Sequence, residues 1–184
     1  MNLAKLFEMQ RQLDERIERE HPRQEGEDRL AKKILALLVE LGELANEARF
    51  FKYWSHDQKP RIVVREWKLY EDTIKEYGDS THRRYEGVVR PVLRQPLLEE
   101  YVDCLHFILS IGLEITEPDM LDLKRWNLTK ADNITEQFLW VMADVTDLYN
   151  GLYHDGNFKF DYEFLLLQFI HLGEMLGFTW SEIE

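Results

Sequence analysis

Apolar residues recur every three or four positions through most of this chain, which is the spacing of one face of an α-helix. The clearest case is residues 34–54, whose apolar face comprises Leu37, Leu41, Leu44, Ala48 and Phe51. Residues 97–115 are apolar around most of the helical circumference, and a helix of that kind is buried on nearly all sides. We therefore expect two long helices at the centre of the fold.

Three further segments with the same period predict helices at residues 2–20, 134–153 and 162–176. Pro22 follows the first of these and Gly177 follows the last, as is typical of helix ends. The pattern predicts an all-α helical bundle that forms a single domain over residues 1–184. Thr179 and Glu182 are typical of the start of another helix. Because the sequence ends before that helix completes two turns, we expect a continuation downstream.

Residues 56–95 interrupt the helical period and predict an irregular insert or lid. Residues 61–77 favour a short strand followed by a helical turn, and the turn residues that follow leave a hairpin or an ordered lid as alternatives. The insert carries a basic cluster of Arg83, Arg84, Arg90 and Arg94. One interpretation is solvated loop charge. The other is a mobile arm that brings cations to a polyphosphate.

Two pairs of carboxylates border the buried helical faces. Glu40 and Glu43 lie three residues apart on the first central helix, and Glu100 and Asp103 repeat that spacing on the second. A carboxylate at the edge of a buried face must meet water, a cation or another helix. Two such pairs on two buried helices predict a four-carboxylate metal site between them, because only cations make so much negative charge tolerable.

Some other acidic, histidine and cysteine side chains have the spacing of functional residues, but we expect them to have structural roles only. Asp144 and Asp147 form a third acidic pair, but they lie on a helix rich in polar residues and are expected to face solvent. His106 follows Asp103 at a spacing that suits a metal ligand, and we interpret it as a histidine at the edge of the core. Cys104 is the only cysteine, and we expect it to be a small buried apolar residue.

Composition and charge exclude several classes of function. Hydrophobic residues make up 45% and charged residues 32% of the chain, as in ordinary globular proteins. The net charge of −12 argues against binding to nucleic acid. No segment reaches the roughly 18 apolar residues that a membrane span needs, and the charged N-terminus does not resemble a signal peptide. A single cysteine favours a reducing compartment, so we expect a cytoplasmic protein.

The motifs that would indicate other chemistries are missing. The sequence has no phosphate-binding glycine loop, no dinucleotide-binding turn, no zinc-protease motif and no serine nucleophile elbow. A ligand set made only of carboxylate oxygens suits Mg²⁺ or Mn²⁺ better than iron or zinc. Magnesium held by carboxylates indicates phosphoryl chemistry, in which the ions neutralise phosphate oxygens and a carboxylate orients the attacking water.

Three segments together resemble a known family. ELGELANEARFFKYW at 40–54, LLEEYVDCLHFILSIGLE at 97–114 and MQRQLD at 9–14 are similar to the dimeric, all-α dUTPases of the MazG-like nucleoside triphosphate pyrophosphatase superfamily. The resemblance implies that two or three Mg²⁺ ions are bound by Glu40, Glu43, Glu100 and Asp103. It implies that Glu40 and Glu43 are the catalytic residues, with Glu43 orienting the water. It also implies a nucleotide site formed by Gln10 at the uracil, Lys52, Trp54, and Phe107 near the deoxyribose.

The implied reaction is dUTP + H₂O → dUMP + pyrophosphate, with dUDP as a second substrate, in a homodimer whose partner chain completes part of each site. The chain departs from the family pattern in its longer 56–95 insert. The resemblance also implies a C-terminal segment that helps to hold the base and phosphates. Because the sequence stops before that segment, we expect metal binding to survive better than uracil selectivity. The alternatives are a pyrophosphatase for another nucleotide, such as dCTP or a modified triphosphate, and a non-catalytic helical dimer that acts as an interaction module.

Overall fold

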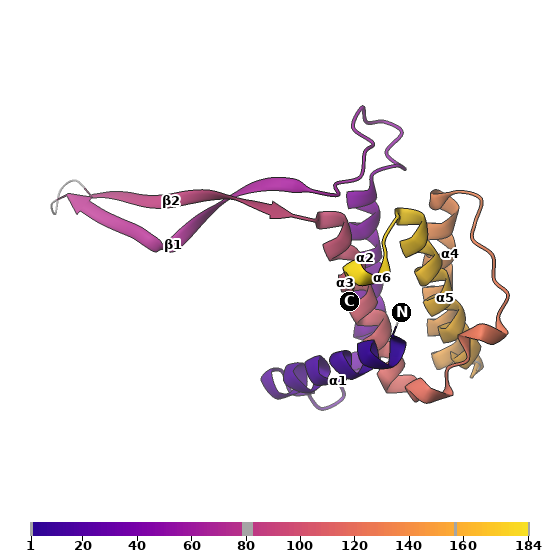
Figure 1. The fold of residues 1–184 in the computed structure, drawn as a ribbon. Coiled ribbons are helices and arrows are strands. Elements are labelled where there is room, and N and C mark those ends of the chain that lie inside the picture. The colour runs from indigo at the N-terminus through magenta and orange to yellow at the C-terminus, as the bar shows by residue number, and fades with distance from the viewer. Residues whose placement is uncertain (1, 79–82, 157, 184) are drawn as a thin grey trace.

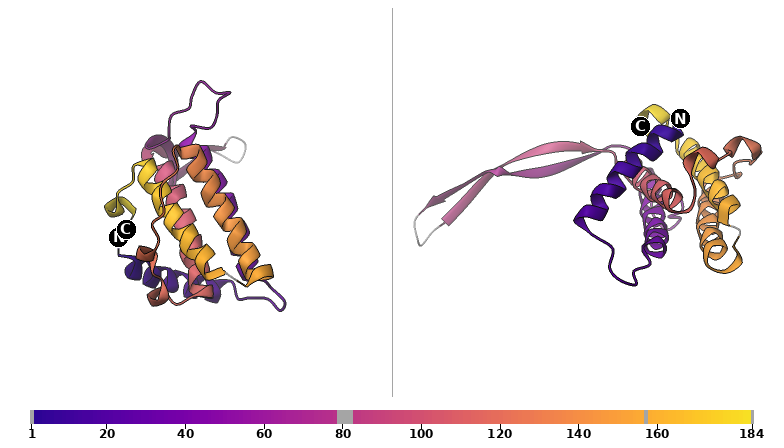
Figure 2. Two further views of the ribbon diagram at one scale, coloured as in Figure 1. Left: turned by 90° about the vertical axis from the view of Figure 1, so that its right-hand side faces the viewer. Right: turned by 90° about the horizontal axis from the view of Figure 1, so that it is seen from below.

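Four long helices pack side by side in this computed structural model, and a fifth helix lies across one end of them (Figures 1 and 2). The structure describes residues 2–78, 83–156 and 158–183. The helices are α1 (Leu3–Glu20), α2 (Arg29–Ala48), α3 (Pro96–Ile115), α4 (Ile134–Asn150), α5 (Phe158–Leu176) and the short α6 (Trp180–Ile183), and the strands are β1 (Val64–Gly78) and β2 (Arg83–Arg94). Two 3₁₀ turns follow α3, and a π-helical turn follows α4. The all-α fold class is confirmed.

The core lies between two antiparallel helix pairs, α2 with α3 and α4 with α5. The predicted apolar face of α2 supplies Leu37, Leu41 and Leu44, none of which has any exposed surface. On α3, Cys104 is also fully buried, as expected of a small apolar residue. Burial of an apolar side chain of this size contributes about 1.5–3 kcal/mol to folding. The pairing of α2 with α3 is therefore set by the same periodic faces that the sequence displays.

Two tyrosines join α3 to α5 at points where only glycine fits. The Tyr162 hydroxyl of α5 donates to the Ile108 carbonyl of α3, and a Cβ on Gly112 would lie 2.0 Å from that hydroxyl. On the opposite side, the Tyr101 hydroxyl of α3 donates to the Phe169 carbonyl, over Gly173 of α5. Two glycines thus let the two helices approach closely and leave each buried phenol with a hydrogen-bond partner.

Helix α2 is shorter than its apolar pattern predicts. It ends at Ala48, because Arg49 has a φ of 64° and its left-handed backbone stops the helix. The buried Arg49 guanidinium donates to the Asp57 carbonyl at 2.9 and 3.1 Å, which holds the following loop against the helix end. The aromatic residues after Ala48 therefore lie in this loop and do not extend the helix to residue 54 as expected.

The predicted insert forms a long antiparallel hairpin that projects away from the helices (Figure 1). Val64 pairs with Arg94 at its base and Gly78 pairs with Arg83 at its far end, with one irregularity between Tyr70 and Lys75. The hairpin alternative is therefore correct. The helical turn expected within residues 61–77 is not formed, because β1 continues through that segment.

Asp144 does not face solvent as expected. It is half-buried on α4, and one of its carboxylate oxygens is buried without a hydrogen-bond partner among the described residues. This burial, together with the charges of Asp147 and Asp161, raises the pKa of Asp144 to about 7. Asp147, in contrast, is exposed.

Within the part of the chain that the structure covers, none of the helices has the length and apolar character that crossing a bilayer requires.

Candidate active site

Three of the four predicted carboxylates meet between α2 and α3. One oxygen each from Glu40, Glu100 and Asp103 lies within 4.8 Å of the others. The two helices run antiparallel, so residue 40 lies opposite residues 100–103, while Lys33, two turns back on α2, forms an ion pair with Glu114 on α3. The convergence follows from helix packing, because both acidic strips border the same buried interface.

The acids of this cluster destabilise one another's charged forms. Partial burial raises the pKa of Glu40, and the charges of Glu43 and Asp103 raise it further. Burial also raises the pKa of Glu100, with added repulsion from Glu43, Asp103 and Glu40. A cation bound among the oxygens would relieve both effects. An oxygen-only donor set of this kind fits Mg²⁺ or Mn²⁺.

Glu43 lies at the edge of the cluster. It is exposed and is not one of the three residues whose oxygens converge. Its charge nevertheless raises the pKa values of both Glu40 and Glu100. Its side chain is therefore close to the cluster and open to water. The expectation that all four carboxylates share cations stays a prediction.

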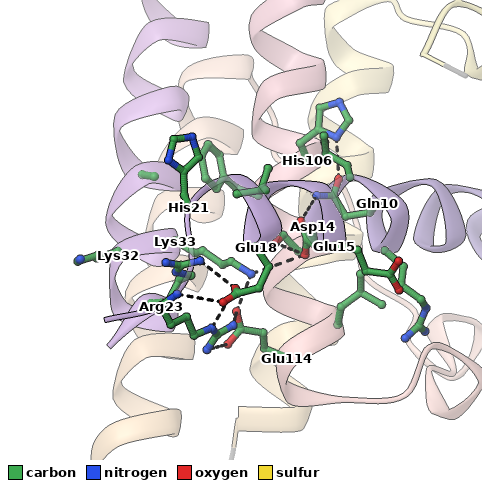
Figure 3. Close-up of a pocket in the computed structure, with 18 of the residues that line it drawn as sticks. Gln10, Asp14, Glu15, Glu18, His21, Arg23, Lys32, Lys33, His106 and Glu114 are labelled. Carbon is green, nitrogen blue, oxygen red and sulfur yellow. Dashed lines mark hydrogen bonds and ion pairs between the residues drawn. The ribbon is translucent and has the colours of Figure 1, made fainter. Parts of the chain in front are cut away.

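A cavity of about 690 Å³ opens next to the carboxylates, between α1, α2 and α3 (Figure 3). Its wall includes Gln10, Asp14, Lys33, Ala36, His106, Phe107 and Ser110. Ala36 lies one helical turn before Glu40 on α2, and Phe107 lies one turn after Asp103 on α3. The cavity and the carboxylate cluster are thus neighbours along one helix–helix interface, about 6 Å apart at 1.5 Å per residue.

Gln10 is fixed in the cavity wall by two hydrogen bonds. Its side chain is 3% exposed, its Nε2 donates to Asp14 Oδ1 at 2.7 Å, and its Oε1 lies 2.7 Å from His106 Nδ1 (Figure 3). A carboxylate only accepts hydrogen bonds, so Asp14 determines which way the Gln10 amide points. Ser110 in turn donates to the other Asp14 oxygen at 2.6 Å. One amide hydrogen and one carbonyl lone pair of Gln10 remain for a ligand.

Sequence reasoning missed part of this wall. His106, interpreted as a histidine at the core edge, is half-buried and lines the cavity, and Asp14 and Ser110 were not singled out. Their only local signal is a four-residue spacing, Gln10 to Asp14 on α1 and His106 to Ser110 on α3, which puts each pair on one helical face. At the rim, Arg23 and Lys33 both form ion pairs with Glu114.

Lys52 and Trp54, the two other residues expected in the nucleotide site, lie in the loop that follows α2. Lys52 Nζ donates to the Asn46 side chain, one turn beyond Glu43 on α2. Trp54 is 65% exposed and contacts Phe51 and Tyr53 edge to face. Among the described residues, Trp54 does not belong to the lining of the Gln10 cavity. A role for these two residues stays a prediction.

A second cavity, of about 290 Å³, lies on the other side of the cluster at the base of the hairpin. Its lining comprises Glu47, Arg61, Val64, Glu66, Arg94, Pro96 and Glu100. Arg94 therefore belongs to the site region. Arg90 lies farther out, 5.5 Å from the centre of the Tyr70 ring, and Arg83 pairs with Gly78 at the far end. The basic cluster that the sequence suggested is spread along the hairpin.

One protein family matches the chain over nearly its whole length. The sequence profile of the dUTPase family matches residues 2–82 and 88–184. The chain belongs to the all-α dUTPase family. The match includes most of the hairpin, so the insert does not separate this chain from the family. No curated protein and no solved structure gave a significant match. Family membership assigns the chain to the dUTP diphosphatases.

Proposed function

We propose that this enzyme hydrolyses dUTP to dUMP and pyrophosphate and requires Mg²⁺. The observation that supports this most directly is the position of the Gln10 cavity next to the triad of Glu40, Glu100 and Asp103. A nucleoside bound in the cavity would place its phosphates at the carboxylates. Because carboxylates and phosphates are both negatively charged, these acids can hold a phosphate through a bridging metal ion.

Glu40, Glu43, Glu100 and Asp103 would hold the Mg²⁺ ions. Three of them offer oxygens close enough to share an ion. Burial, together with repulsion from neighbouring acids, raises the pKa values of Glu40 and Glu100, and a bound cation would oppose this shift. When bound, the ions would neutralise the negative charge of the phosphate oxygens and the charge that develops on the leaving pyrophosphate. The number of ions in this proposal is two or three.

Glu43 would orient the attacking water. It is the exposed acid at the edge of the cluster, so water reaches it, and its carboxylate can accept a proton from that water. Glu40 lies one turn earlier on α2, and its half-buried position fixes it closer to the helix interface. The attacking water splits the P–O–P bridge between the α- and β-phosphates, which leaves dUMP and releases pyrophosphate.

Gln10 would bind the base and Phe107 would pack near the deoxyribose. The free amide hydrogen and lone pair of Gln10 match the adjacent carbonyl oxygen and N–H of uracil. Phe107 is half-buried in the same cavity and offers an apolar surface to the sugar. Lys52 and Trp54, in the loop that follows α2, would also line the nucleotide site. We also propose a homodimer, in which the partner chain completes part of each site, and dUDP as a second substrate.

The deciding experiment is a substrate panel. Initial rates are measured on dUTP, dCTP, dTTP and UTP, each with Mg²⁺ and with Mg²⁺ removed by a chelator. We expect hydrolysis of dUTP to exceed that of dCTP by about two orders of magnitude, as hydrogen-bonded recognition of a base permits. The bases of dTTP and UTP present the same carbonyl and N–H to Gln10, so these two substrates test the space around the C5 and 2′ positions. A preference for dCTP or for a modified nucleotide would replace uracil in the proposal. Absence of turnover on every triphosphate would favour a non-catalytic role.

A further inference from the structure

The interface of α2 with α3 carries three chemically different regions in a fixed order. The cavity with Gln10 lies beside Ala36 and Phe107, the carboxylate triad follows, and the cavity at the hairpin base lies beside Glu47 and Pro96. Positions 36, 40 and 47 lie within about 60° of one another around α2 at 100° per residue. Positions 36 and 47 are 11 residues apart, which is about 16 Å along the helix. All three regions therefore lie on one line.

This order is the order of the parts of a nucleoside triphosphate. On the function proposed above, the nucleoside occupies the Gln10 cavity and the scissile phosphate lies at the carboxylates. The β- and γ-phosphates must then continue toward the hairpin base. The two regions adjoin there, because Glu100 belongs to the triad and also lines the cavity.

Two guanidinium groups line that end of the site. Arg61 Nη1 lies 3.0 Å from Glu47 Oε1, while Arg94 pairs with Glu99 and, at 3.3 Å, with Glu66. Both arginine side chains are about 45% exposed, so a ligand in the cavity can reach them. Guanidinium groups match phosphate oxygens in a bidentate geometry, which is why arginine is common where phosphates bind.

Backbone hydrogen bonds hold Arg61 between the C-terminal end of α2 and the N-terminal end of α3. Its N–H donates to the Glu47 carbonyl in the last turn of α2, and its carbonyl accepts from the Leu97 N–H in the first turn of α3. Arg94 is the last residue of β2, two residues before α3 begins. The two ends of the insert are thus anchored to the same helices that carry the carboxylates. Each guanidinium is already oriented by an acid before any phosphate arrives.

We propose that Arg61 and Arg94 form a subsite for the pyrophosphate group of the substrate. Their two positive charges neutralise the β- and γ-phosphates at the end of the site farthest from Gln10. Phosphate oxygens replace part of the contact with Glu47 and Glu66, whereas Glu99 keeps the Arg94 guanidinium in place. The insert then contributes to substrate recognition through the residues at its two ends, next to the helices. The outer part of the hairpin is not needed for this step.

Product inhibition tests this subsite. Inhibition constants for inorganic pyrophosphate and for dUMP are measured during Mg²⁺-dependent dUTP hydrolysis, in the wild-type enzyme and in Arg61→Gln and Arg94→Gln. We expect the constant for pyrophosphate to rise about tenfold or more in each variant, from the loss of a charged bidentate contact. The constant for dUMP, which fills only the nucleoside and α-phosphate positions, should change by less than about twofold.

Arg90→Gln is the matched control, because it removes the same charge from the same face of β2 four residues farther out. It should leave both constants unchanged. Unchanged pyrophosphate inhibition in Arg61→Gln and Arg94→Gln would overturn the proposal, as would an equal rise for dUMP or a large loss of Tm, which would indicate a structural role. Calorimetric titration of each protein with Mg²⁺ and pyrophosphate gives the same comparison without turnover. If the wild type binds pyrophosphate but hydrolyses no dUTP, only the proposed function fails.

Discussion

Gln10 shows how a single side chain acquires a defined chemical role from its neighbours. An isolated glutamine amide can present its oxygen or its nitrogen to a ligand, and nothing local chooses between them. Here Asp14 accepts from Nε2 of Gln10, so Oε1 of Gln10 faces His106. Because an amide oxygen only accepts, the proton of that hydrogen bond must be on Nδ1 of His106. The amide orientation therefore depends on a residue that does not itself have to touch the base.

Replacing Asp14 with asparagine should weaken base selectivity. An asparagine can donate or accept, so the Gln10 amide would no longer be held in one orientation. We expect the ratio of kcat/KM for dUTP to that for dCTP to fall about tenfold, the worth of roughly one net hydrogen bond. Asp132→Asn, an exposed change of the same kind outside the cavity, is the control. A ratio that stays at the wild-type value would show that Asp14 does not govern the orientation of Gln10.

Glu43 is the residue on which turnover should depend most. Glu43→Gln keeps the shape of the side chain but cannot accept a proton from water, so kcat should fall by about two to four orders of magnitude. Binding of a non-hydrolysable dUTP analogue should weaken far less. Single-turnover rates and calorimetric titration separate the two quantities. Glu20→Gln, at the exposed end of α1, should behave as wild type, and a Glu43→Gln enzyme with normal kcat would remove Glu43 from the catalytic mechanism.

Asp144 makes stability depend on pH in an unusual direction. Burial raises its pKa to about 7 from the ordinary value of 3.8, so the folded chain holds this proton more tightly than the unfolded chain does. Its contribution to stability is therefore present below pH 4 and is lost as pH rises toward 7. Asp144→Asn should raise the Tm at pH 8 by a few degrees and leave it nearly unchanged at pH 4. Asp147→Asn, at an exposed neighbour, should have a smaller effect in thermal melts followed by circular dichroism.

At the scale of elements, the hairpin is the part least supported by the rest of the fold. Among the described elements, each strand packs extensively only against the other strand. One face of the ribbon combines Trp67, Leu69, Val89 and Leu93, all between 46% and 67% exposed. A two-stranded ribbon of this kind is marginally stable on its own. Because few contacts join the ribbon to the helices, the stability of the helices depends little on it.

Removing the outer hairpin should leave the helical body intact. Replacing residues 66–92 with Asn-Gly would close the chain between Arg65 and Leu93, which face each other across the ladder. We expect the Tm to change by only a few degrees and dUTP hydrolysis to persist, because Arg61 and Arg94 remain. Circular dichroism melts and initial rates measure both. Loss of folding would show that the hairpin stabilises the helices. Loss of activity in a folded protein would give the outer strands a role in catalysis.

The helices could be predicted from sequence because the period of their apolar faces is a local property, whereas the end of α2 and the full length of the hairpin could not. Phe50 and Phe51 continue the apolar pattern of α2, and nothing in the sequence marks Arg49 as the left-handed residue that ends it. Carboxylate spacing likewise predicted Glu40, Glu100 and Asp103. The contact of Gln10 with His106 joins residues 96 positions apart, so it depends on how α1 crosses α3 and has no local signature.

At the scale of the whole molecule, charge is distributed unevenly. Residues 61–95 contain eight basic and six acidic residues, whereas the remainder contains 15 basic and 29 acidic residues. A nucleoside triphosphate approaching the helical body therefore meets net charge of its own sign, and the carboxylate cluster adds to this repulsion. Binding of nucleotide and of Mg²⁺ should consequently be strongly coupled, since each neutralises the charge that repels the other.

This coupling predicts a thermal shift that neither ligand produces alone. A non-hydrolysable dUTP analogue at about 100 times its dissociation constant stabilises the folded state by about 2.7 kcal/mol, which corresponds to a rise in Tm of about 5–10 °C for a chain of this size. With Mg²⁺ alone, or with the analogue and a chelator, the rise should be only a small part of this. In Glu100→Gln the combined shift should shrink, because one triad oxygen loses its charge. An equal shift with the analogue in the presence of a chelator would mean that the nucleotide binds through protein groups only, and the carboxylates between α2 and α3 would then have no part in holding it.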